Sequence, residues 1–157
     1  MNRALSIPEW HRLAMEGTAL PVRIPLMGIS MFPLIRYNKD YVTVVPAEKD
    51  LQVGDIVLFV DQERELYVMH RVWELNGDMV LTWGDNCIAP DRWMAREEIW
   101  GRAVMIERGK RKINADPRKG IRWAKFWHRA GKVYRYCENK KCDVVRRLRK
   151  LSKRGNK

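Results

Sequence analysis

Cysteine is scarce in this sequence of 157 residues. It has three cysteines, and an odd, sparse set of thiols argues against a disulfide framework. Its longest apolar runs, such as residues 56–60, are strand-sized and fall far short of the roughly 18 residues of a membrane span. The first 17 residues contain no apolar core of a secretory signal. We therefore expect a protein of the reducing cytoplasm.

Acidic residues are scarce after position 116. Residues 117–157 hold 16 of the 31 Lys and Arg but 2 of the 19 Asp and Glu, a net charge of +14. Residues 1–116 then carry a net charge of −2, so the overall charge of +12 belongs to the C-terminal segment. Apolar residues make up 46% of the chain, which is enough to bury a core. We expect a near-neutral globular unit followed by a basic segment.

The hydrophobic pattern of the first two thirds predicts one helix and then strands. Ser6, followed three residues later by Glu9, is a possible capping box that begins a helix over 7–17. Short runs rich in β-branched and aromatic residues follow, and the Asn76-Gly77 pair predicts a tight antiparallel hairpin. The expected strands are 22–27, 41–45, 55–60, 66–75, 79–83 and 99–107.

The pattern changes again beyond position 112. Apolar residues three to four apart among Lys and Arg predict two basic amphipathic helices, over 117–136 and 141–153. We therefore expect a mainly β fold, antiparallel, with a short N-terminal helix and C-terminal basic amphipathic helices. Its three parts are an N-terminal helix and lead-in (1–20), a β-domain (21–112) and a basic helical tail (113–157).

Three histidines are the candidate general bases. His11 and His128 lie in predicted helices among charged residues, and we expect both to face solvent. His70 lies in the middle of a predicted strand, where alternation places it on the same side as Val68 and Val72. Because a histidine in a strand is often a structural residue, this position alone does not establish catalysis.

Two loops supply candidate partners for His70. Ser30 follows an apolar strand, and Pro33 prevents a regular strand from continuing. Such a turn either projects the hydroxyl from the end of the strand or bonds it to its own backbone. Asp85 and Asp91 flank a second loop, and a carboxylate buried beside His70 would hold the imidazole in one tautomer. The order of these residues does not establish a triad, and either aspartate is a candidate.

Five segments follow one another in a specific order. They are Gly28-Ile29-Ser30-Met31-Phe32-Pro33, Val53-Gly54-Asp55-Ile56-Val57-Leu58-Phe59, Met69-His70-Arg71-Val72, Gly84-Asp85-Asn86 followed by Asp91-Arg92, and Ile99-Trp100-Gly101-Arg102-Ala103-Val104. Together they resemble the motif boxes of the signal peptidase and LexA-like serine peptidase superfamily, over about residues 21–107. Each box is weak by itself, whereas five in register are specific. The resemblance implies the compact antiparallel β-fold of that superfamily.

The residue at the position of the general base indicates which branch of the superfamily the chain resembles. Bacterial type I signal peptidases and LexA-like repressors use a Ser-Lys dyad, whereas His70 stands at this position here. The chain is therefore similar to the endoplasmic-reticulum and archaeal type of signal peptidase, which pairs Ser with His and uses an Asp. By register with that branch Asp91 matches the triad Asp, and Asp85 is the alternative third member.

The resemblance implies a serine endopeptidase that cleaves leader- or signal-like peptides through an acyl-enzyme. Ser30 would be the nucleophile, His70 the general base and Asp91 the group that orients it. The backbone N–H of Ser30 would donate to the oxyanion, and that of Gly28 is a second candidate donor. Dyad-type relatives often have a side-chain hydroxyl at the position of Gly28, and its loss is typically worth about 100- to 1,000-fold in rate.

The remaining site and partner expectations concern the substrate. Met31 and Pro33, which flank the nucleophile, are the candidate substrate contacts. No cofactor is expected, and no metal either, because Cys137 and Cys142 have too few further ligands nearby for zinc. We expect neither a membrane anchor nor an N-terminal DNA-binding domain, because no apolar run is long enough to span a membrane and about 20 residues precede the expected strands. We therefore expect a stand-alone relative suited to removing leaders from ribosomally made peptides.

The basic segment 117–157 has four interpretations. It packs on the β-domain through Trp123, Trp127 and Tyr134, or it binds an anionic membrane surface, which would hold the protein on the inner membrane face. It docks an acidic peptide or partner, or it binds nucleic acid, for which no base-reading motif is present. A second function class also stays open, a catalytically weak or inactive peptide-binding module of the same fold.

Overall fold

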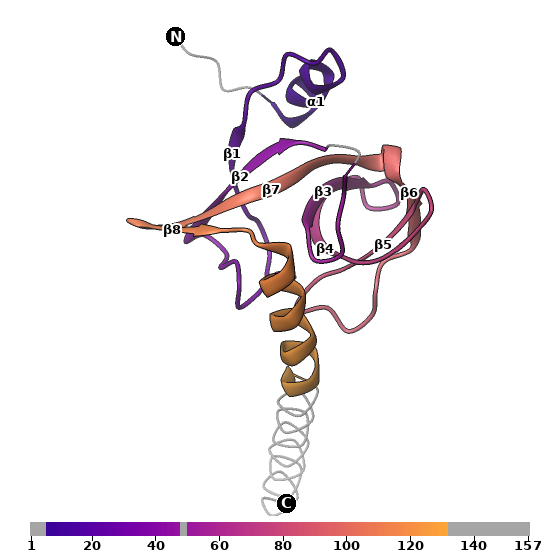
Figure 1. The fold of residues 1–157 in the computed structure, drawn as a ribbon. Helices are drawn as coiled ribbons and strands as arrows, with labels where there is room; N and C mark the ends of the chain where they lie inside the picture. Colours follow the sequence, from indigo (N-terminus) through magenta and orange to yellow (C-terminus); the bar gives the residue numbers. More distant parts are fainter. Residues whose placement is uncertain (1–5, 48–49, 132–157) are drawn as a thin grey trace, which may run out of the picture.

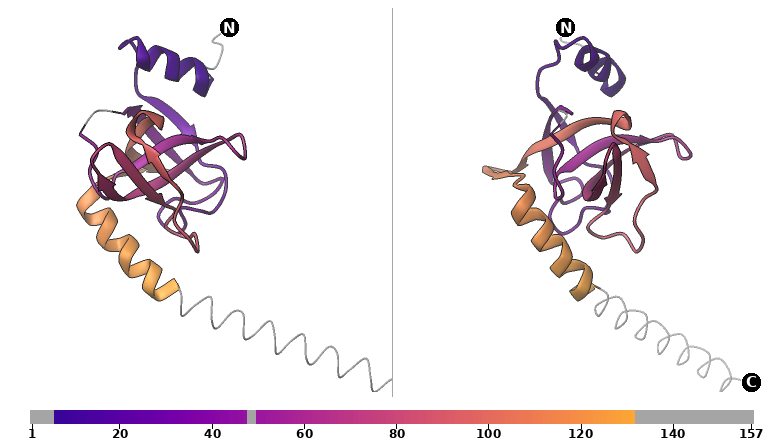
Figure 2. Two further views of the ribbon diagram at one scale, coloured as in Figure 1. Left: turned by 90° about the vertical axis from the view of Figure 1, so that its right-hand side faces the viewer. Right: turned by 45° about the vertical axis from the view of Figure 1, so that its right-hand side comes forward.

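One antiparallel sheet lies between two helices. The structure is a computed structural model that describes residues 6–47 and 50–131. Helix α1 (Ile7–Met15) lies at one end of the sheet, and a second helix, residues 117–131, leads away from the other end (Figures 1 and 2). Neither of these described helices has the length and apolarity needed to cross a membrane.

The sheet has eight strands and curls strongly (Figure 1). The strand order is β1-β2-β7-β3-β4-β5-β6, with β8 paired to β7, and all pairs are antiparallel. A short 3-10 turn, Arg96–Glu98, joins β6 to β7. The strands are β1 (Val22–Pro25), β2 (Asp40–Pro46), β3 (Ile56–Asp61), β4 (Leu66–Asn76), β5 (Met79–Trp83), β6 (Trp93–Ala95), β7 (Ile99–Arg108) and β8 (Arg111–Asn114).

This architecture confirms the mainly β, antiparallel fold class with a short N-terminal helix and a helix near the C-terminus. The six expected strands are present, with ends that differ by no more than two residues. The sequence pattern missed β6 and β8, which are three and four residues long and too short to show an alternation. The expected helix over 141–153 lies outside the described residues.

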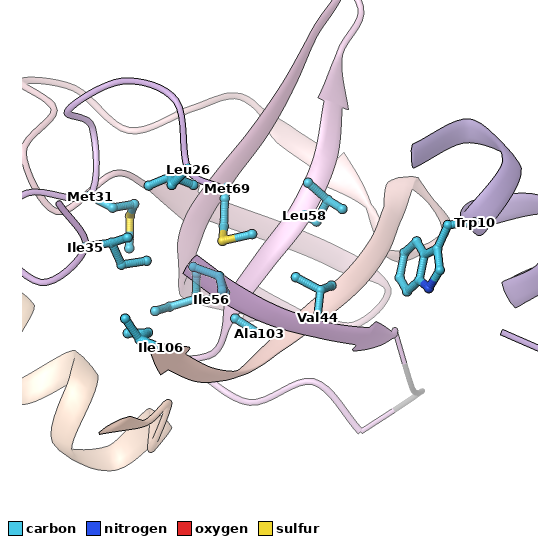
Figure 3. Packing of buried hydrophobic residues seen from close by; sticks show 11 residues of the cluster. Trp10, Leu26, Met31, Ile35, Val44, Ile56, Leu58, Met69, Ala103 and Ile106 are labelled. Atoms are coloured by element: carbon cyan, nitrogen blue, oxygen red, sulfur yellow. The ribbon is translucent and has the colours of Figure 1, made fainter. Parts of the chain in front are cut away.

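Strand β3 is the innermost strand because both of its faces are buried. Ile56 and Leu58 join a cluster that includes Trp10 of α1, whereas Val57 and Phe59 join a second cluster. Alternation along one strand thus divides the core into two parts, one on each face of the curled sheet. Figure 3 shows the first cluster, whose members come from strands, from α1 and from the loop after β1.

The N-terminal helix begins as its sequence predicts. The Ser6 side chain accepts from the backbone N–H of Glu9, and the Glu9 side chain accepts from the Ser6 N–H at 2.9 Å, which completes a capping box. Trp10 is 1% exposed and donates from its ring nitrogen to the Leu20 carbonyl at 2.8 Å. A side chain at Gly101 would overlap the Trp10 ring, so a glycine of the sheet makes room for this anchor.

The C-terminal helix packs on the β-domain, as one of the four interpretations of the basic segment expects. Ala124 is fully buried, and Trp127 lies edge-on to Phe32, with ring centroids 6.4 Å apart. The helix begins against Gly54, where a Cβ would lie 2.1 Å from the Pro117 carbonyl oxygen. Its exposed face includes Phe126, which is 60% exposed, together with five basic residues: Arg118, Lys119, Arg122, Lys125 and Arg129.

The expectation that His128 faces solvent is wrong. The side chain is buried, and its ring centroid lies 5.1 Å from that of Trp73 and 4.3 Å from that of Trp83. His128 follows the buried Ala124 by four residues, so both lie on the inner face of the helix.

Trp123, which was also expected to pack on the β-domain, is 39% exposed, and its ring lies beside those of Phe126 and Trp127 of its own helix. Tyr134, the third of these aromatic residues, lies outside the described residues.

The contact between Gly120 and Arg71 generates a stability prediction. Replacing glycine by alanine inside a helix ordinarily stabilises it by about 1 kcal/mol. At Gly120 the new Cβ would lie 2.3 Å from Arg71 Nη1, whose guanidinium is buried and held by other groups. We expect Gly120→Ala to destabilise the protein by about 1–3 kcal/mol, as overpacking does.

Urea unfolding of Gly120→Ala measures this change, with Arg122→Ala as the control. Arg122 is exposed on the same helix, so its replacement should change the free energy of unfolding by less than about 0.5 kcal/mol. A Gly120→Ala protein that is more stable than the wild type would show that the helix does not press on Arg71.

Candidate functional site

His70 lies in the middle of β4 and points into the second core cluster. It pairs with Val57 of β3, and its ring lies edge-on to Phe59 with centroids 6.1 Å apart. Val68 and Val72 pack in the same cluster, which agrees with the face expected from alternation. The His70 side chain is only 9% exposed, so its polar atoms need partners within the protein.

The loop after β5 supplies one of those partners. Asp91 Oδ2 lies 2.6 Å from His70 Nδ1, and the Thr82 hydroxyl donates to the same oxygen at 2.7 Å. The backbone N–H of Asp91 donates to the Thr82 carbonyl at 2.9 Å, which holds the end of the loop against β5. Because a carboxylate only accepts, Nδ1 carries the proton and Nε2 is the nitrogen that faces away from Asp91.

Asp85 pairs with the neighbouring residue on β4 instead. Its carboxylate accepts two hydrogen bonds from Arg71, at 2.9 and 2.7 Å, and both side chains are buried. Arg71 also donates to the Gly54 carbonyl at 2.8 Å. His70 and Arg71 point to opposite faces of β4, so one loop provides an acidic partner on each face. Of the two aspartates considered, Asp91 is the one that contacts His70.

Ser30 lies in a turn after β1 that the core holds from beneath. Met31 and Ile35 are fully buried in the first core cluster, so the Met31 side chain anchors the turn from the core side and is not exposed as a contact surface. Pro33 is half-buried. Gly28 has φ +96°, a left-handed conformation that favours glycine. These features give the Ser30 turn a fixed shape.

Two hydrogen bonds join the Ser30 turn to the loop of Asp85 and Asp91. The Asn86 N–H donates to the Ser30 carbonyl at 2.7 Å, and the Asn86 side-chain amide donates to the Ile29 carbonyl at 3.2 Å. The sequence segments expected to carry the nucleophile and the acid are therefore in direct contact. Asn86 was not among the candidate residues expected from the sequence. Its position in the Gly-Asp-Asn turn was the feature that could have indicated this contact.

His70 Nε2 faces Cys87, which was not among the site residues expected from the sequence. Cys87 Sγ lies 3.9 Å from His70 Nε2. Among the residues that the structure describes, no hydrogen bond joins Ser30 to His70. The signal for Cys87 was its position, directly after the turn that contacts Ser30.

The surroundings of His70 change its pKa. Burial disfavours the charged ring and lowers the pKa, but the hydrogen bonds with Asp91 and Cys87 act in the opposite sense and outweigh it together with the negative charge nearby. The net result raises the pKa of His70 to about 9. At neutral pH the ring is therefore mostly protonated, and both ring nitrogens carry a proton.

The other candidates lie apart from this centre. The His11 ring stacks on Trp100, with centroids 3.9 Å apart, next to the N-terminal helix. Within residues 6–47 and 50–131, no group of three or more His, Cys, Asp or Glu side chains is arranged to hold a metal ion. Cys137 and Cys142 lie outside these ranges. No protein-family model matches the sequence.

The two aspartates of the loop should respond differently to the same substitution. Asp85→Asn leaves the buried Arg71 charge without its partner, which should cost about 3–5 kcal/mol of stability. Asp91→Asn replaces a carboxylate that is partly exposed and should cost no more than about 2 kcal/mol. It should also lower the pKa of His70, because the largest contribution that raises it is lost.

Urea unfolding and an NMR titration of the His70 ring measure both effects. A larger loss of stability in Asp91→Asn than in Asp85→Asn would contradict the division of roles between the two carboxylates. An unchanged His70 titration in Asp91→Asn would contradict their contact.

Proposed function

We propose that the protein is a serine endopeptidase of the signal peptidase-like, Ser-His-Asp type, which cleaves leader- or signal-like peptides. The observation that carries the proposal is the chain of contacts from Thr82 through Asp91 to His70, beside the turn of Ser30. The resemblance of the five motif boxes supports the same function. Both arguments name the same aspartate.

The proposed chemistry is acyl transfer. Ser30 Oγ attacks the peptide carbonyl while His70 Nε2 takes its proton, and His70 then returns that proton to the leaving amine. Water hydrolyses the acyl-enzyme in the second half of the reaction. Asp91 keeps the proton on Nδ1, so that Nε2 is the nitrogen available to Ser30.

The oxyanion would be held by backbone donors. Within the described residues, no hydrogen bond donated by the Ser30 or the Gly28 N–H is present, so both donors remain for a bound carbonyl. The Ser30 N–H belongs to the turn that Asn86 and the core residue Met31 hold in place. Donors that are fixed before the reaction need no reorganisation when the negative charge develops.

Exposed apolar side chains beside the site suit an apolar peptide. Met27 and Ile29 flank the Ser30 turn and are 71% and 64% exposed, and Ile88 follows Cys87 and is 82% exposed. An extended peptide would lie across these side chains, with main-chain hydrogen bonds for affinity and small pockets for specificity. The resemblance to signal peptidases adds a preference for small residues just before the cut.

The basic face of the C-terminal helix suits an anionic partner. Its five basic residues and the exposed Phe126 are of the kind that bind an anionic membrane surface or an acidic region of a precursor protein. Either partner would bring a peptide substrate close to the domain on which the helix packs. The catalytic proposal does not depend on this second contact.

One observation favours a second candidate, a peptide-binding module without catalysis. His70 Nε2 faces Cys87 at 3.9 Å, and the raised pKa of His70 keeps the ring protonated at neutral pH. A site of this kind would hold a peptide beside the Ser30 turn and leave it uncut. A reagent that reports on the Ser30 hydroxyl distinguishes the two candidates.

A fluorophosphonate probe tests the proposed peptidase directly. The full-length protein should be labelled at Ser30, and Ser30→Ala should remove the label completely. His70→Gln should slow labelling about 100-fold or more, since general-base assistance is typically worth that much. Ser6→Ala is the matched control, because Ser6 caps α1 far along the chain from the site and should leave labelling unchanged. If the wild type is not labelled at any pH, the binding module is favoured.

The labelling rate should also depend on pH. Only the neutral form of His70 accepts a proton, so the rate should rise with pH and level off above the His70 pKa of about 9. At pH 7 the rate should be about one hundredth of the plateau, because pH 7 lies about two units below the pKa of His70. Labelling followed from pH 6 to pH 10 measures the profile. A rate that levels off near pH 6.5 would contradict the raised pKa.

A further inference from the structure

Cys87 is a nucleophilic group next to His70 that the proposed peptidase mechanism does not use. Its Sγ lies 3.9 Å from His70 Nε2, the nitrogen that faces away from Asp91. The side chain is partly exposed, and Ile88, the next residue, is exposed to 82%. Cys87 is therefore not enclosed in the core.

The backbone around Cys87 holds the sulfur in this place. Its N–H donates to the Gly84 carbonyl at 2.9 Å, and its carbonyl accepts from the Trp83 ring nitrogen at 3.1 Å. A Cβ at position 84 would lie 2.6 Å from Cys87 Sγ and 2.8 Å from His70 Nε2. Only a glycine at this position leaves the space in which the sulfur and the imidazole meet.

A chain of contacts leads from the Cys87 sulfur to the carboxylate of the site. Cys87 faces His70, His70 is bonded to Asp91, and Asp91 also accepts from Thr82. This is the order of nucleophile, base and orienting group that activates a thiol or a hydroxyl. The base proposed to serve Ser30 therefore faces the thiol in this structure.

We propose that Cys87 is a thiol modification site for small sulfur electrophiles, with His70 as the base that activates it. In the reaction, the thiol proton passes to Nε2 of His70, which leaves an imidazolium beside a thiolate, and the thiolate attacks a sulfur atom of a disulfide or thiosulfonate. A new S–S bond forms, the S–S bond of the reagent breaks, and the leaving sulfur group departs with the electron pair. His70 then releases its proton to the leaving group or to water.

Modification of Cys87 should also close the peptidase site, an effect that rests on the proposed function. A group attached to Sγ would lie in front of His70 Nε2 and separate it from Ser30. A reducing thiol would remove this group by exchange at the same sulfur atom. The modification would thus turn the peptidase off reversibly.

The first experiment measures the reactivity of Cys87 alone. Full-length protein with Cys137→Ser and Cys142→Ser keeps Cys87 as its one cysteine. Methyl methanethiosulfonate is the probe, followed by mass spectrometry at pH 7, where a thiol without an activating base is mostly protonated. His70→Gln should lower the modification rate about tenfold or more. Asp91→Asn should also lower this rate. His11→Gln is the matched control, because the His11 ring stacks on Trp100 apart from the site, and it should react within twofold of the parent. Equal rates in the parent, His70→Gln and Asp91→Asn would overturn the proposal.

The second experiment measures whether modification closes the peptidase site. Treatment with methyl methanethiosulfonate should abolish fluorophosphonate labelling of Ser30, and dithiothreitol should restore it. Cys87→Ala should be labelled equally with and without treatment. Undiminished labelling of a fully modified protein would overturn the closing effect. If the serine probe fails but Cys87 still reacts in a His70-dependent way, the proposed peptidase fails and the thiol site stands.

Discussion

The buried ion pair between Arg71 and Asp85 is the interaction on which the rest of the site depends. Both side chains are removed from water, and Arg71 also bonds the Gly54 carbonyl and touches Gly120 of the C-terminal helix. The pair thus joins β4, the loop after β5 and the helix at one point. Because the loop is held at Asp85, the residues that follow it, Cys87 and Asp91, are carried to the opposite face of β4.

The sequence predicted the fold well where an element is long enough for its hydrophobic pattern to repeat. The long strands and the hairpin at Asn76 were found because alternation and turn chemistry act over several residues, whereas β6 and β8 were too short for either signal. His128 was misjudged because basic residues such as Lys125 and Arg129 lie close to it in the sequence, whereas its burial follows from the helix face that it shares with Ala124. The contact of the helix with Trp73 and Trp83 depends on tertiary packing, which no local pattern contains.

The sequence predicted which residues form the candidate site, but it did not predict all of the contacts between them. Alternation placed His70 on its face of β4, and the motif boxes favoured Asp91, which lies 2.6 Å from the ring. Spacing could not separate Asp91 from Asp85, because that choice depends on which face of β4 each carboxylate reaches. Cys87 was missed for a related reason, since its proximity to His70 follows from the tight turn at Gly84.

The placement of His70 and Arg71 side by side on β4 makes the site sensitive to strand register. β3 and β4 form a hairpin in which Val57 opposes His70 and Ile56 opposes Arg71. A slip of one residue in this hairpin would exchange the two faces of β4. The guanidinium would then meet Asp91 and the imidazole would enter the space beside Asp85 and Gly120. Because the length of a hairpin loop sets the register of its strands, a single inserted or deleted residue between Asp61 and Leu66 would threaten the fold and the chemistry together.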